Sequence, residues 1–280
     1  MLIHRSRSPR KGLLAAALLV VMSLAVAASA QATTLPTLTL TVSKTAITVG
    51  GATQSGGVNI VSSAPGIKEA NTVLFLLKPG ITEAEVETGL KESKKDPNRT
   101  VKYGTIVFDQ EAPASGMAEA QTNLQAGRYL ALAGEGEGGK KQHTFFTVTA
   151  AAAPAALPTP EATVRSIEFG FRGPKVLHDG ELVRFENEGF LIHMDIAFRA
   201  KTKADAYRIV SDLRTGHEKG VEKLVAGEPF TFAGPISHEA FMQETITAKP
   251  GWYVQACFME TQDGRDHTRL GMERIIQIVK

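Results

Sequence analysis

The segment GWYVQACFMETQDGRDHTRLGM, residues 251–272, decides the fold of the second half of the chain. It begins as the pattern of a half-buried β-strand, which ends at Cys257, the only cysteine in 280 residues. Nine residues separate this thiol from His267, and Met272 follows in a Gly-Met pair. A thiolate, an imidazole and a thioether on one loop are donors suited to a transition metal. The segment therefore predicts a closing β-hairpin whose loop carries metal ligands.

A second segment, FENEGFLIHMDIAF at residues 185–198, supplies another imidazole. Its alternation of apolar and polar residues indicates a strand that begins near His193. A copper ion that shuttles between two oxidation states is commonly held by two imidazoles, a thiolate and a weak thioether. The two segments contain one donor for each of these places, in the order His193, Cys257, His267 and Met272.

The two segments resemble the cupredoxins, the family of plastocyanin, azurin and the type 1 copper domains of nitrite reductases. Residues 185–198 are similar to the family's Asn-x-x-Gly…His segment. Residues 251–272 are similar to its closing strand and ligand loop, which end in Gly-Met. The resemblance covers residues 162–280, and four ligand positions fall in register at once.

The resemblance implies one type 1 copper site, with two imidazole ligands, a thiolate ligand and an axial methionine. Met272 is the expected axial ligand, but Met194 and Met259 are also sulfur donors and stay open as alternatives. The long loop between cysteine and histidine is nearer to the nitrite reductase type than to the small blue copper proteins. The implied ligands are His193, Cys257, His267 and Met272.

The first half of the chain repeats this plan without the full set of donors. The repeat appears when the terminal strand that begins at Gly127 is aligned on the strand that begins at Gly251. We therefore expect an all-β fold of two tandem cupredoxin-like Greek-key β-sandwiches, each with a short inserted helix. Only the second sandwich would bind metal. The residues opposite His193, Cys257 and His267 in the first copy are Ala70, Ala133 and His143.

Helical spacing of apolar residues predicts the inserted helices at residues 82–96 and 203–216. Alternation in SIEFGF predicts one uninterrupted strand over residues 166–171. An Ala/Pro-rich stretch with almost no charge predicts an extended linker. The predicted divisions are a signal peptide at 1–30, a metal-free sandwich at 31–149, a linker at 150–162 and the copper domain at 163–280.

The first thirty residues have the order of a secretory signal: a basic start, an apolar stretch and a small-residue cleavage site. Removing them removes four basic residues and no acidic ones, which leaves 27 Lys and Arg against 29 Asp and Glu. A nearly neutral mature chain gives no reason to expect nucleic acid as a partner. We expect an exported protein, secreted or periplasmic, without a membrane anchor after cleavage.

These features predict an exported copper protein that transfers electrons to a redox partner or carries copper. The alternative is a metal-free structural or interaction module of the extracytoplasmic space. The chain has none of the His-x-His pairs of multicopper enzymes and no nucleophile motif beside Glu218 or Glu244, so we expect it not to be an enzyme. Asn98 lies in Asn-Arg-Thr, a glycosylation sequon.

Overall fold

The computed structural model describes residues 34–68, 70–93, 96–134 and 142–280. Contacts join Thr34–Lys280 into one compact unit. The predicted signal peptide lies outside the described residues, so export stays a prediction. Within the part of the chain that the structure describes, no helix is both long enough and apolar enough to cross a membrane.

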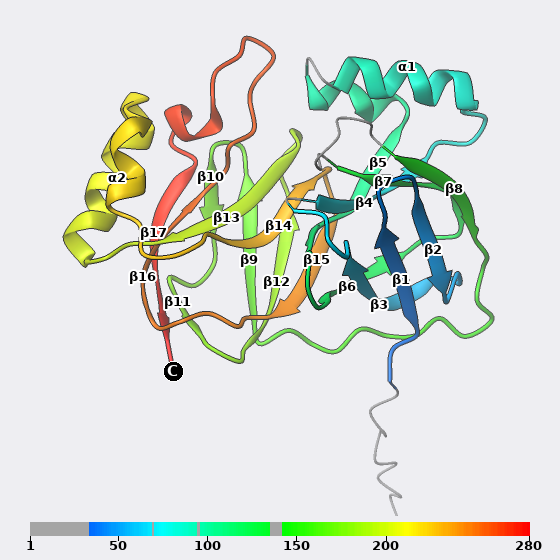
Figure 1. Cartoon of the computed structure of the whole chain (residues 1–280), viewed down its shortest axis with the longest axis horizontal. Coiled ribbons are helices and arrows are strands. Elements are labelled where there is room, and N and C mark those ends of the chain that lie inside the picture. Colours follow the sequence, from blue (N-terminus) through cyan, green and yellow to red (C-terminus); the bar gives the residue numbers. More distant parts are fainter. Residues whose placement is uncertain (1–33, 69, 94–95, 135–141) are drawn as a thin grey trace, which may run out of the picture. The chain divides into compact units, whose positions relative to one another are not determined.

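The described residues of the first half form β-strands, one α-helix and one 3-10 helix (Figure 1). Alternating buried and exposed positions in its first strands produce the buried face expected from their sequence. In chain order the elements are β1 (Thr37–Val42), β2 (Ile47–Gly51), β3 (Gly56–Ser63), β4 (Ala70–Leu77), α1 (Glu83–Ser93), η1 (Pro97–Lys102), β5 (Gly104–Ala112), β6 (Ala118–Leu124), β7 (Gly127–Ala133) and β8 (His143–Val148).

The second half has the same alternation of strands and a single inserted α-helix. Its elements are β9 (Ala162–Ile167), β10 (Gly170–Arg172), β11 (Val176–His178), β12 (Leu182–Asn187), β13 (His193–Arg199), α2 (Lys203–Thr215), η2 (Glu218–Lys223), β14 (Phe230–Ile236), β15 (Phe241–Thr245), β16 (Gly251–Ala256), η3 (His267–Leu270) and β17 (Glu273–Val279).

The described strands form three sheets that enclose a shared apolar core. A four-stranded sheet, β5-β4-β7-β8, belongs to the first half, and a five-stranded sheet, β11-β17-β16-β13-β14, belongs to the second. The third sheet has eight strands in the order β10-β9-β12-β15-β6-β3-β1-β2, so it passes through both halves. Its two parts meet where Gln243 of β15 pairs with Gln121 of β6. The all-β prediction with an inserted helix in each half is confirmed.

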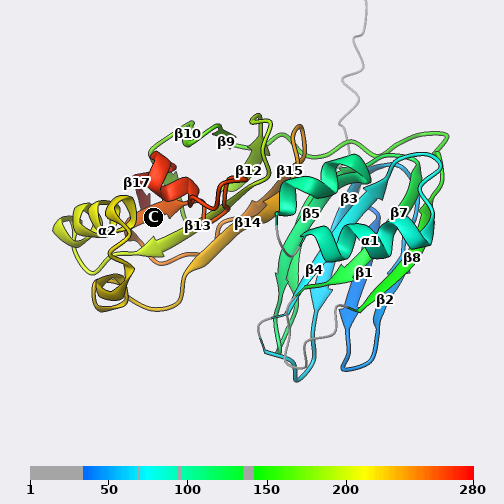
Figure 2. The same ribbon diagram turned by 90° about the horizontal axis from the view of Figure 1, so that it is seen from above.

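Both inserted helices begin at the predicted place because a threonine caps each one. Thr82 and Glu85 bind each other's amides in a capping box before α1, and Thr202 accepts from the amide of Asp205 before α2. Gly216, with a φ of 72°, ends α2 in the left-handed conformation that glycine tolerates. Figure 2 shows α1 over the sheet that contains β4 and β5, and α2 beside β13.

The prediction of one strand over residues 166–171 is wrong. The chain turns at Glu168 and Phe169 and returns as β10, which pairs antiparallel with β9. Phe169 takes a φ of 57°, a conformation more usual for glycine or asparagine in a tight turn. The alternation of Ile167, Phe169 and Phe171 hides this turn, although Gly170 within it is a common turn residue.

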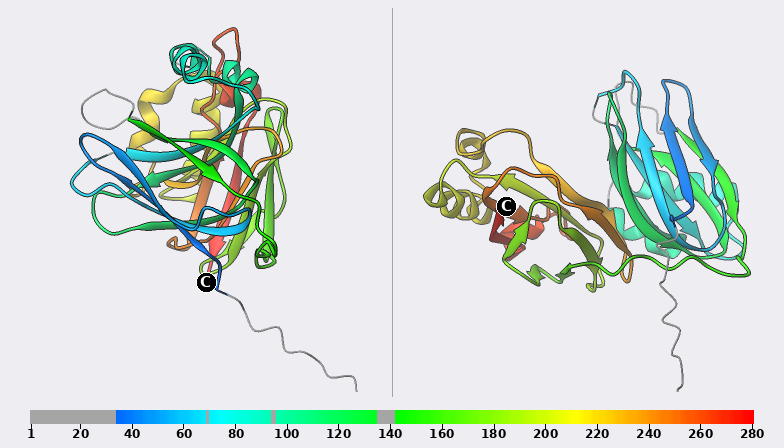
Figure 3. Two further views of the ribbon diagram at one scale, coloured as in Figure 1. Left: turned by 90° about the vertical axis from the view of Figure 1, so that its right-hand side faces the viewer. Right: turned by 90° about the horizontal axis from the view of Figure 1, so that it is seen from below.

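The stretch predicted as a linker runs as extended chain between β8 and β9 (Figure 3). It is bound on the way: the amide of Gly57 donates to the carbonyl of Ala155 at 2.7 Å, and the side-chain amide of Gln243 donates to the carbonyl of Pro158 at 3.0 Å. The two bonds connect this stretch to Gly57 in the first half and to Gln243 in the second half. The domain boundaries themselves stay a prediction.

Candidate metal centre

Strand register brings the predicted ligands to one end of the five-stranded sheet. β13 and β16 are antiparallel with Ile196 opposite Ala256, so the start of β13 lies beside the end of β16. β17 pairs with β16 with Glu273 opposite Ala256, and the amide of Cys257 donates to the carbonyl of Met272 at 3.2 Å. Antiparallel pairing therefore places residues from distant parts of the sequence at one site.

The long loop after Cys257 closes on itself. Glu260 and Asp266 form a β-bridge, and the turn between them is closed by Thr261, whose amide donates to the carbonyl of Arg265 at 2.9 Å. The amide of His267 then donates to the carbonyl of Met259 at 2.8 Å. This turn takes up the extra length of the loop. His267 therefore lies beside Met259, only two residues after Cys257.

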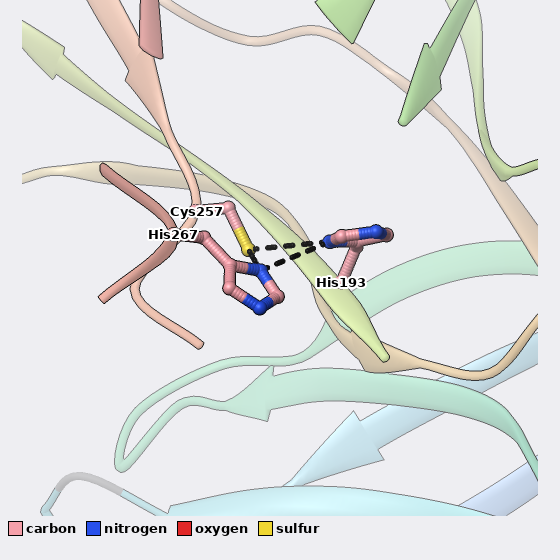
Figure 4. A group of neighbouring side chains, drawn as sticks. All are labelled: His193, Cys257 and His267. Atoms are coloured by element: carbon pink, nitrogen blue, oxygen red, sulfur yellow. Dashed lines mark hydrogen bonds between the residues drawn. The ribbon is translucent and has the colours of Figure 1, made fainter. Parts of the chain in front are cut away.

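Three of the four predicted ligands meet, with their donor atoms facing one another (Figure 4). The Nδ1 atoms of His193 and His267 are 3.2 Å apart, and the Sγ atom of Cys257 lies 3.8 Å from the first and 3.4 Å from the second. A point equidistant from three atoms with these separations lies about 2.0 Å from each, close to the nitrogen–metal and sulfur–metal bond lengths of protein sites. The three residues therefore fit a single small transition-metal ion.

Burial leaves both imidazoles in the form that a metal requires. His193 and His267 are 1% and 0% exposed. Burial, with a smaller contribution from His267, lowers the pKa of His193 to about 4, and burial also lowers the pKa of His267. Neutral rings protonated on Nε2 present both Nδ1 lone pairs to the centre, and neither Nε2 atom has a hydrogen-bond partner among the described residues. The Nδ1 atoms, and not these outward-facing Nε2 atoms, are the donors that a metal at the centre would meet.

The cysteine sulfur is buried in the apolar cluster beside the two rings. Burial raises the pKa of the Cys257 thiol to about 12, and hydrogen bonds from the amides of Met194 and Met259 act in the opposite direction. The amide of Met194 lies 3.4 Å from the sulfur. A bound cation would replace the thiol proton, and these amide donors would then stabilise the thiolate.

Met272 is placed by its backbone at the same site. Its amide donates to the carbonyl of His267 at 3.0 Å, and its carbonyl accepts from the amide of Cys257. The side chain is fully buried in the cluster that contains the cysteine. Met259 and Met194 pack in that cluster too, so the choice of axial ligand stays a prediction.

The loop before His193 is held by Asn187, the asparagine of the segment that resembles the cupredoxins, and by Glu168, which the sequence did not single out. Asn187 is fully buried; it donates to the carbonyls of Leu191 and Ile236 at 2.8 Å and accepts from the amide of Gly189. Glu168, from the β9–β10 turn, accepts from the amides of Phe190 and Leu191. These bonds fix the backbone that leads directly to the ligand.

Glu168 and Phe169 also cover the two rings. An oxygen of Glu168 lies 3.9 Å from the Nε2 atom of His193, on the side away from the centre. Phe169 packs edge-on against His267 with 5.2 Å between ring centroids. The turn missed in the sequence thus contributes a carboxylate behind one ligand and an aromatic cover to the other.

No protein-family model and no curated protein matches the chain. Among solved structures it is similar to auracyanin A, a "blue" copper protein from Chloroflexus aurantiacus, with 17% identity, 42% of this chain and 96% of that chain covered, and a TM-score of 0.25. It is also similar to a copper nitrite reductase from Nitrosomonas europaea (10% identity, 87% and 93% covered, TM-score 0.24) and to a multicopper oxidase (10%, 87% and 88%, 0.24).

The predicted resemblance to cupredoxins is confirmed, since a His-Cys-His cluster lies in a β-sandwich at the expected positions. The cluster also supports copper as the cofactor. At these identities and TM-scores the similarities assign no activity to this chain. The prediction that it is not an enzyme is nevertheless corrected, because two of the similar structures are enzymes. The lack of His-x-His pairs in the sequence argues only against the catalytic copper cluster of multicopper enzymes, and not against other enzymes.

Gly189 lets the loop approach the first imidazole closely. A Cβ atom on this residue would lie 2.6 Å from Nε2 of His193 and 2.7 Å from an oxygen of Glu168. We expect Gly189→Ala to push the ring away from the centre and to weaken copper binding about tenfold or more, as losses behind a metal ligand do. Competition with a copper chelator measures the change. Gly220→Ala is the matched control, because its Cβ would meet only Asp212 at 3.6 Å; equal affinities for the two variants would contradict the argument.

The lowered pKa of His193 predicts acid sensitivity of the metal-free protein. With a pKa of about 4 when folded and about 6.5 when unfolded, this ring takes up its proton first in the unfolded chain as the pH falls. Its contribution to the free energy of unfolding is complete above pH ~6.5 and is lost by pH ~4, a change of up to about 3 kcal/mol. Urea unfolding measures the free energy of unfolding at pH 7 and at pH 4.5. The decrease between the two pH values should be smaller for His193→Gln than for the parent. The exposed control His178→Gln should behave like the parent, and an equal loss in all three would refute the assignment.

Proposed function

We propose that this chain is an exported type 1 copper protein that transfers electrons through one mononuclear site. His193 and His267 supply the imidazole ligands and Cys257 the thiolate. The proposal is supported above all by the convergence of their three donor atoms around a point about 2.0 Å from each. Two imidazoles and a thiolate in a trigonal arrangement are the donor set of blue copper centres rather than of tetrahedral zinc sites.

Burial of the ligands favours electron transfer over copper carriage. A carrier must exchange its ligands with those of a partner, and this requires access to the donor atoms. The three donor residues are at most 1% exposed and are embedded in the core. Electron transfer needs no such access, and a rigid buried site suits an ion that changes oxidation state without changing its ligands. A redox partner protein is part of this proposal.

The three ligands have distinct tasks when copper is bound. Copper, when bound, would supply the change of oxidation state. Cys257 would hold it as a thiolate and His193 and His267 as neutral imidazoles, while Phe169 packs against the ring of His267 and excludes water from it. The amides of Met194 and Met259 donate to the sulfur of Cys257. By lowering the electron density on this sulfur, they would tune the reduction potential of a bound copper ion.

Adding Cu(II) to the purified mature protein should produce an intense visible band from thiolate-to-copper charge transfer and raise the melting temperature. Cys257→Ser should remove the band, because it removes the only thiol. Ser115, an exposed residue between β5 and β6, offers a control: Ser115→Cys adds a thiol without a site and should not restore colour to Cys257→Ser. A parent protein that gains neither colour nor thermal stability would favour the metal-free structural alternative.

We further propose Met272 as the weak axial ligand. Met272→Leu should change the reduction potential and shift the visible bands, because the axial donor tunes both. Met194→Leu and Met259→Leu are matched controls, since both methionines pack in the same apolar cluster. Voltammetry and optical spectra of the three variants decide the matter. If either control variant changes the potential and the bands more than Met272→Leu does, the methionine substituted in that control is the axial ligand.

A further inference from the structure

The metal-free first half reaches the backbone beside a predicted copper ligand. The amide of Ile192 donates to the Oδ1 atom of Asn98 at 2.8 Å, a bond between residues 94 positions apart in the sequence. Asn98 belongs to η1 in the first half, and Ile192 immediately precedes His193. We propose that Asn98 is a positioning residue for the copper centre, which it serves by holding the main chain of Ile192. This inference rests on the proposed function of the site.

Asn98 completes a set of side-chain acceptors along the loop before the ligand. The amide of Gly189 is bound by Asn187, and the amides of the next two residues are bound by Glu168. Asn98 binds the fourth amide, that of Ile192. The last acceptor before the imidazole therefore comes from the other half of the chain. A backbone amide that loses its acceptor in a buried place destabilises the conformation that buried it.

The side chain of Asn98 is itself held in the orientation that this bond needs. Its backbone amide donates to Oδ1 of Asp96 at 2.9 Å, and its Nδ2 atom donates to the same oxygen at 3.2 Å. With nitrogen on the carboxylate, the carbonyl oxygen is the atom left to face Ile192, so the hydrogen-bond network fixes the amide orientation. Asp96 is 8% exposed and also caps η1.

A second contact ties the neighbouring strand to the first half. Ser237, which follows β14, accepts from the amide of Ile106 at 2.9 Å through its hydroxyl and donates its own amide to the carbonyl of Ile106 at 3.0 Å. Ile236, the residue before Ser237, is the register partner of His193 in the β13–β14 pair. The first half thus holds the His193 side of the site at two places, on the ligand's own chain and on its neighbour.

The bond also bears on the glycosylation sequon at Asn98. Glycan attachment would use the Nδ2 atom, which is engaged with Asp96 in the folded protein. The folded structure therefore gives both polar atoms of the Asn98 side chain a hydrogen-bonding role.

The test compares three variants of the full chain. Asn98→Ala removes the acceptor for Ile192. The charge-conserving exchange Asp96→Asn with Asn98→Asp keeps an acceptor oxygen at position 98 and lets the new asparagine donate to it. Asn59→Ala is the control, because Asn59 binds Glu119 within the first half. Copper affinity, the visible spectrum and electron paramagnetic resonance are measured on each loaded protein, and hydrogen exchange of the Ile192 amide is measured on each metal-free protein.

We expect Asn98→Ala to weaken copper binding about tenfold, to alter the charge-transfer band and to speed exchange of the Ile192 amide about tenfold. The double variant Asp96→Asn with Asn98→Asp should show the parent's visible spectrum and the parent's protection of the Ile192 amide. The control Asn59→Ala should match the parent in both. A folded Asn98→Ala protein with the parent's spectrum and amide protection would overturn the proposal. A parent that takes up no copper would instead defeat the proposed function, and amide exchange would then decide the role of Asn98 alone.

Discussion

The convergence of two imidazole nitrogens and one thiol sulfur inside an apolar core is the constraint on which the rest of the structure depends. Lone pairs that face one another in a buried place lack the solvent that would otherwise satisfy them. The separations of 3.2 to 3.8 Å bring the three atoms close enough together to surround one small ion. The surrounding strands and loops must hold this arrangement before a metal arrives, because the free side chains would otherwise turn apart.

A β-sandwich meets this constraint by dividing the task between two kinds of support. Strand register places His193 at the start of β13 and Cys257 after the end of β16, and it needs only backbone hydrogen bonds. Loops then supply the remaining precision. The turn between Glu260 and Asp266 returns His267 to the strand end, and side-chain acceptors fix the loop before His193. Rigidity at the centre is therefore the sum of a regular sheet and of specific side-chain bonds.

The sequence predicted the parts of the site that have a local pattern. The cluster of His193, Cys257 and His267 follows from donor type and order, and the helix starts follow from capping residues. The support around the site had no such pattern. Glu168 and Phe169 lie in a turn that a continuous apolar alternation conceals. The bond from Asn98 to the ligand loop joins residues 94 positions apart, so no local rule of spacing could reveal it.

The first half explains why such support can be reliable. The positions predicted to lie opposite two of the ligands are Ala70 and Ala133, and both are buried in the main apolar core. Small apolar residues fill these places without unsatisfied donors, so this part of the shared core packs without an ion. His143, at the third position, is only half-buried and faces Glu87 at 3.3 Å. The contacts from Asn98 and from β5 to the second half need no ion of their own. Because they arise from residues outside the metal cluster, they hold the ligand loop in the same place whether or not the site is filled.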